Sequence, residues 1–151
     1  MDVRAEFVSY AERWLGKPYL WAGDDPMAGF DCSGLVMECG KAVGLFEDSW
    51  DFNAEGLWTR FKTKELTRPY QPYAGCLVLW FNAYGFAVHV AIMKNERLII
   101  HAGGGGSKTA TLQDAIRQNA FVMMRSLERV ASARKALWNQ DYRIVDPFRE
   151  S

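Results

Sequence analysis

Apolar residues recur at two different spacings along the chain. In the first part they fall three to four positions apart, which predicts helices, and further on they form short runs bounded by turn residues, which predict strands. Helices followed by strands predict an α+β fold with an antiparallel sheet of about five strands. The predicted helices are 3–15, 33–43, 53–61 and 112–119, and the predicted strands are 75–81, 87–94, 97–102, 121–124 and 142–145.

The first predicted helix is amphipathic. Val3, Phe7, Ala11 and Trp14 share one face among charged neighbours, unlike the apolar core of a secretion signal. No apolar run approaches the roughly 18 residues of a membrane span. We therefore expect no membrane partner and no signal peptide, so that the protein is made in the cytoplasm. We expect residues 1–151 to form a single domain.

Composition and charge narrow the class of protein. The chain has 151 residues, of which 49% are hydrophobic, enough for a core without disulfides or bound metal. Lys plus Arg and Asp plus Glu both number 18, so no long-range field favours nucleic acid as a partner. Basic residues near the end of the chain are interspersed with acidic ones, which predicts a solvated helical face. They are Arg125, Arg129, Arg134, Lys135 and Arg143.

Cys32 stands where the second predicted helix begins. The unpaired amides of a helix N-terminus favour a negatively charged sulfur and can bind an oxyanion. Asp31 would raise the thiol pKa, and we expect a nearby imidazolium to outweigh it. Free cysteines more commonly act as small buried apolar residues, and Cys39 and Cys76 fit that description.

His89 and His101 are the two histidines of the chain, and each falls in a predicted strand. A hairpin centred on Asn95 would place them nearly opposite each other on one face. One imidazole could then take the thiol proton and the other could orient it. A single strand histidine is more commonly a hydrogen-bonded core residue, but two on one face favour catalysis.

Four segments, 18–23, 30–36, 89–92 and 100–102, resemble the motif series of the NlpC family of papain-like cysteine peptidases. The resemblance implies a papain-like fold in which the nucleophile helix packs against the sheet. It further implies that Cys32 is the nucleophile, His89 the general base and His101 the orienting residue.

Members of that family typically cut peptidoglycan stem peptides between D-glutamate and a diamino acid, without a cofactor. By resemblance the substrate-binding residues are Tyr19, Asp31 and Ser33, and Trp21 could wall the pocket with Tyr19. Short phage members of the family look similar to this chain, so we expect delivery by a phage tail or lysis system, with phage tail proteins as partners. One departure is Ala22, where a glycine is common, and another is the long glycine run 103–106.

Other functions are compatible with parts of the sequence. The run 102–109 is a near miss to a phosphate-binding loop, but Ala102 and Ser107 replace the two required glycines. We expect it to be a mobile flap at the rim of the cleft. The cysteines and histidines lack the spacing of a zinc site, so no metal is expected. The same nucleophile and base could serve an amidase, an acyltransferase or a deamidating toxin, and a non-catalytic phage tail component is a further alternative.

Overall fold

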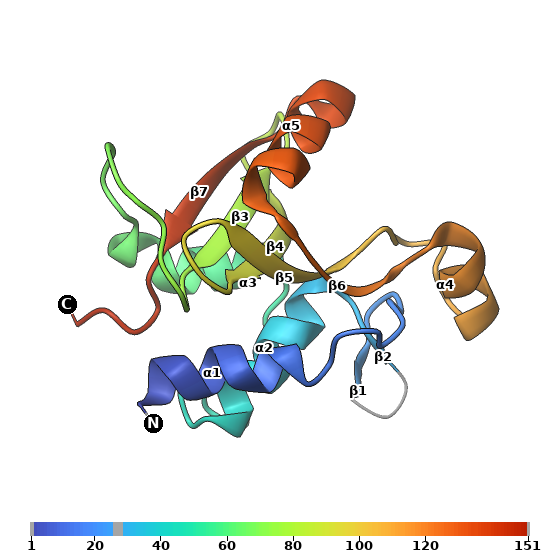
Figure 1. The fold of residues 1–151 in the computed structure, drawn as a ribbon, viewed down its shortest axis with the longest axis horizontal. Helices are drawn as coiled ribbons and strands as arrows, with labels where there is room; N and C mark the ends of the chain where they lie inside the picture. The colour runs from blue at the N-terminus through green and yellow to red at the C-terminus, as the bar shows by residue number, and fades with distance from the viewer. Residues whose placement is uncertain (1, 26–28, 151) are drawn as a thin grey trace.

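The computed structural model describes residues 2–25 and 29–150 and shows one antiparallel sheet with helices on both sides (Figure 1). The strand order is β6-β5-β4-β3-β7, and each neighbouring pair is antiparallel. The α+β class and the five-stranded sheet are therefore confirmed. The strands are β3 (Leu77–Phe81), β4 (Ala87–Met93), β5 (Leu98–Gly103), β6 (Phe121–Ser126) and β7 (Asp141–Val145).

Three helices cover one side of the sheet: α1 (Val3–Glu12), α2 (Cys32–Ala42) and α3 (Ala54–Phe61). Asp31 and Asn53 cap α2 and α3, and each side chain accepts a hydrogen bond from a backbone N–H of the first turn. These caps explain why the predicted helices start within one residue of the observed ones. A 3₁₀ turn (Lys62–Lys64) follows α3, and a two-stranded ribbon of β1 (Asp24–Asp25) and β2 (Gly29–Phe30) precedes α2.

The opposite side of the sheet carries α5 (Leu127–Trp138), which the strand and helix predictions omitted. Of the basic residues expected on a solvated helical face, Arg129 and Lys135 lie exposed on α5. Arg125 and Arg143 lie on β6 and β7 instead, so the prediction is wrong for these two. Arg134 also lies on α5, but it is half-buried against the sheet. The short helix α4 (Leu112–Gln118) extends from one end of the sheet, between β5 and β6.

Successive side chains of β3 point to opposite faces of the sheet and belong to two different apolar clusters. Leu77 and Leu79 point into a large core beneath α1, α2 and α3, whereas Val78 and Trp80 belong to a smaller cluster beneath α5. Among the described residues, no helix has the length and apolar character needed to cross a membrane.

Candidate active site

Cys32 is the first residue of α2, and close backbone packing determines its position. The Asp31 carboxylate Oδ1 accepts a hydrogen bond of 2.7 Å from the Gly34 N–H, and the Asp31 N–H donates to the Gly23 carbonyl at 3.0 Å. A Cβ on Gly34 would lie 1.8 Å from that carbonyl oxygen. Only glycine therefore allows the first turn of α2 to approach the preceding turn this closely.

The two histidines meet across β4 and β5. His89 Nε2 and His101 Nδ1 are 2.8 Å apart, and both side chains are 6% exposed. The contact predicted from the hairpin is therefore confirmed, with a different register. Ile92 pairs with Ile100, so the hairpin is centred on Glu96 and not on Asn95. Each pairing partner is thereby shifted by two residues, and the two rings approach diagonally.

The Cys32 sulfur lies against the backbone of β4 beside His89. The N–H groups of Val90 and Ser33 hydrogen-bond to the sulfur and lower its pKa. Burial has the larger effect and, together with the Asp31 carboxylate, raises the pKa of Cys32 to about 11. Because His101 occupies Nε2 of His89, Nδ1 is the ring nitrogen that remains for the thiol.

Burial also disfavours the charged form of both imidazoles. It lowers the pKa of His89 well below its usual value and lowers the pKa of His101 to about 3, and Arg134 adds to both shifts. The expectation that an imidazolium holds Cys32 as a thiolate is therefore wrong for the resting site. Burial instead favours a neutral thiol beside neutral imidazoles.

Tyr19 borders the same site and is 5% exposed. Burial, followed by the nearby Cys32 and Asp31, raises the pKa of its phenol, which therefore stays protonated and able to donate a hydrogen bond. The glycine run packs on these rings: a Cβ on Gly105 would lie 2.3 Å from Tyr19 Cδ1, and one on Gly103 would lie 2.7 Å from His101 Cε1. Those two glycines allow the loop to contact the site.

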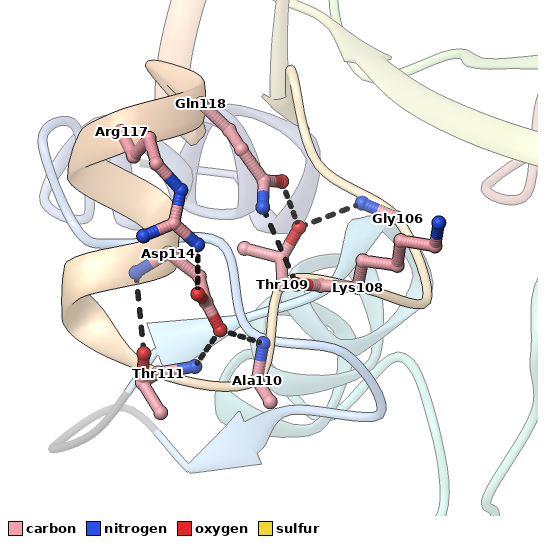
Figure 2. Close-up of polar contacts among 8 residues, drawn as sticks. All are labelled: Gly106, Lys108, Thr109, Ala110, Thr111, Asp114, Arg117 and Gln118. Carbon is pink, nitrogen blue, oxygen red and sulfur yellow. Dashed lines mark hydrogen bonds and ion pairs between the residues drawn. The ribbon is translucent and has the colours of Figure 1, made fainter.

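A network of hydrogen bonds around Thr109 holds the far end of that loop in place (Figure 2). The buried Thr109 hydroxyl accepts from the Gly106 N–H at 3.0 Å and donates to Gln118 Oε1 at 2.6 Å. The Thr109 carbonyl in turn accepts from the Trp21 N–H at 2.8 Å. The loop is thus tied to α4 and to the segment before the nucleophile, and the Gly106 amide is already used, which argues against a phosphate-binding role.

A cavity of about 440 Å³ lies beside the N-terminus of α2. Asp31 and Ser33, the predicted substrate-binding residues, line one part of it, and Asp51 and Asn53 line another. Sequence reasoning missed Asp51 because it lies outside every recognised motif. Trp21 does not line this cavity and is 56% exposed, so the cavity gives no support to its predicted role in the pocket wall.

The remaining predictions about individual residues concern cysteines, metal and the turn before α2. Cys39 and Cys76 are buried and free, as expected of apolar core residues. No group of three metal-ligating side chains occurs in the part of the chain that the structure describes. Ala22 adopts φ of 59°, the left-handed region that favours glycine, which explains why a glycine is common there.

Comparisons with known proteins identify the family. The model of the NlpC/P60 family matches residues 16–126. The bifunctional muramidase/DL-endopeptidase CwlT of Bacillus subtilis is 30% identical over 124 residues, which are 81% of this chain and 36% of CwlT. The gamma-DL-glutamyl hydrolase of the same organism is 32% identical over 97 residues, 63% of this chain and 22% of that protein.

Solved structures agree with the sequence relatives. The crystal structure of the NlpC/p60 domain of the peptidoglycan hydrolase SagA is 25% identical, with a TM-score of 0.64, and the match covers 94% of this chain and 97% of that domain. The match to this chain spans only part of each Bacillus relative, 36% of CwlT and 22% of the gamma-DL-glutamyl hydrolase. The family match over 16–126 and the shared fold show that this chain belongs to the NlpC/P60 family.

Proposed function

We propose that the protein is a cysteine endopeptidase that hydrolyses peptidoglycan stem peptides between D-glutamate and the diamino acid. The observation that carries this proposal is the hydrogen-bonded histidine pair beside Cys32 at the start of α2. Membership of the NlpC/P60 family and similarity to a DL-endopeptidase and a peptidoglycan hydrolase support the choice of substrate.

The neutral resting site suits a general-base mechanism. As the Cys32 sulfur attacks the peptide carbonyl carbon, His89 Nδ1 takes the thiol proton and the carbonyl oxygen becomes an oxyanion. The C–N bond then breaks, and His89 returns the proton to the leaving amine. Water attacks the resulting thioester with His89 again as base, which releases the acid and restores the thiol. Amides at the N-terminus of α2 and the Tyr19 hydroxyl are the candidate donors to the oxyanion.

His101 acts on His89 and not on the substrate. Because His89 must accept a proton at Nδ1, its Nε2 carries hydrogen and donates to His101 Nδ1. This bond holds the His89 ring in one tautomer and one orientation. The proton of His101 then resides on its Nε2, which is buried and has no partner among the described residues.

The cavity beside Cys32 suits the amino end of a stem peptide. Its two carboxylates, Asp31 and Asp51, would attract the ammonium group of a free N-terminal alanine. Expected partners beyond peptidoglycan, namely phage tail proteins, and delivery by a phage tail or lysis system stay predictions.

The test compares a synthetic stem peptide that has a free N-terminal alanine with the same peptide acetylated at that end. We expect the free peptide to be cut faster at the D-glutamyl bond, as followed by mass spectrometry. Asp31→Asn should shrink the preference, since asparagine keeps the helix cap but removes the charge. Asp48→Asn, at an exposed position, is the control.

Three results would overturn the proposal. Equal cleavage of both peptides would contradict recognition of the ammonium group. Transfer of the acyl group to an added amine in preference to water would indicate an acyltransferase. Binding of peptidoglycan without cleavage would indicate a non-catalytic member of the family, as RipD of Mycobacterium tuberculosis is described.

A further inference from the structure

Arg134 on α5 is a cation that forms no ion pair with any carboxylate in the part of the chain that the structure describes. Its guanidinium carbon lies 5.6 Å from the ring centroid of Trp80 and 5.1 Å from that of Trp138. Its Nε atom is buried without a hydrogen-bond partner among the described residues. Partial burial of an unpaired charge is costly, and the faces of the two tryptophans offset only part of that cost.

Ring contacts connect this cation to the catalytic histidines. Trp80 pairs with His89 across β3 and β4, and their ring centroids are 5.5 Å apart. The His89 and His101 centroids are in turn 5.0 Å apart. The guanidinium therefore stands behind the histidine pair, on the α5 side of the sheet.

Few charges other than Arg134 act on the catalytic thiol and the two imidazoles. Arg125 adds a second positive charge near His101, and Asp31 is the carboxylate that acts on Cys32 and on Tyr19. Arg134 lowers the pKa of both imidazoles and of the thiol, while burial lowers its own pKa to about 10, so it remains charged at neutral pH. None of the ion pairs among the described residues includes Arg134, and at Cys32 its charge acts against that of Asp31.

We propose that Arg134 is a positioning residue for the cysteine chemistry: its charge adds to burial in keeping His89 and His101 neutral, so that His89 can accept the thiol proton, and it favours negative charge on sulfur. This inference rests on the proposed function. It also gives α5 a role, although that helix lies outside the part of the chain that the family model matches.

The two histidines of the chain make a direct test possible, because their ring signals can be followed by NMR without any substrate. Arg134→Met keeps an aliphatic stem over Trp80 but removes the charge, and Arg134→Gln is a second uncharged variant. With the charge removed, the protonated fraction of each imidazole at mildly acidic pH should rise about tenfold, the effect of roughly one pKa unit. Arg134→Lys should stay close to the wild type.

The pH dependence of Cys32 alkylation by iodoacetamide gives a second readout that needs no activity. The profile should move to higher pH in Arg134→Met and stay in place in Arg129→Met, which removes an exposed arginine of the same helix. Unchanged histidine titration in both uncharged variants, or equal shifts in Arg134→Lys and Arg134→Met, would overturn the proposal. If the histidine and alkylation profiles shift as expected but the wild-type protein does not cut stem peptides, the result would count against the proposed substrate alone.

Discussion

The two sides of the sheet differ in how they are covered. Beneath α1, α2 and α3 the core is continuous, and Phe7, Leu35 and Leu57 are fully buried. Beneath α5 the cluster is smaller, and the end of that helix exposes Leu137 and Trp138. One side thus holds the nucleophile helix rigidly, while the other presents a charged residue to the back of the histidine pair. We therefore expect the helix side to supply most of the stability and the α5 side to tune the electrostatics of the site.

The catalytic groups lie where the two sides meet. Cys32 comes from the helix side, whereas His89 contacts Trp80, which belongs to the α5 cluster. Substitutions in the site and on each side of the sheet should therefore differ in their effects on activity and stability.

Cys32→Ser should cause the largest effect, a loss of about 10⁴-fold or more in peptide cleavage, because a serine hydroxyl is a far weaker nucleophile here. The variant should unfold at the same temperature as the wild type. Iodoacetamide should label Cys32 faster than the buried Cys39 and Cys76 in the native protein. Equal labelling of all three thiols would contradict the assignment.

His89→Ala should lower kcat by about 10²- to 10⁴-fold, since the general base is lost. His101→Gln should lose less, because its amide oxygen can still accept the His89 ring proton and orient the ring. Steady-state kinetics with the stem peptide would compare the two. A larger loss at His101 than at His89 would reverse the assigned roles.

Leu79→Ala and Val130→Ala compare the stability of the two sides directly. Leu79 is fully buried on the helix side, so its truncation should lower the free energy of unfolding by about 2–5 kcal/mol. Val130 is half-buried on α5, so Val130→Ala should lower the free energy of unfolding by only about 1 kcal/mol. Urea denaturation measures both. Equal losses would show that the α5 side contributes as much stability as the helix side.

The buried neutral histidines predict sensitivity to acid. The pKa of His101 is lower in the folded protein, about 3, than its usual 6.5, so the unfolded chain binds more protons between these values. Stability should therefore fall as the pH drops from 6.5 toward 3, by about 2.5 kcal/mol from this residue between pH 7 and pH 4.5. Urea denaturation at pH 7 and 4.5 should show a smaller fall in His101→Gln. An identical fall in both proteins would contradict a neutral buried His101.

Gly105→Ala should have the smallest effect on activity, a loss of about tenfold, because the new methyl group collides with Tyr19 and shifts a group at the reaction centre. Gly106→Ala is the matched control, since a Cβ there meets no atom within 4 Å. Peptide cleavage and thermal unfolding would be measured for both. Equal activity in the two variants would show that the loop does not position Tyr19.

Local signals in the sequence determined much of the site. Asp31 marks the start of α2 because a capping side chain needs only the amides of the next turn. The short strands and the turn between them brought His89 and His101 to the same face, and only two histidines were available to form the pair.

Only the tertiary structure decided the rest, because it depends on segments far apart in the chain. The hairpin register, the approach of Gly105 to Tyr19 and the place of Asp51 in the cavity follow from packing between elements. The neutral resting state of Cys32 and the histidines could not be predicted either, since burial outweighs the local effects that sequence reveals and, at the histidines, the charge of Arg134 adds to burial. Local hydrogen bonding is encoded within a few residues, whereas burial and electrostatics arise only when the sheet brings distant segments together.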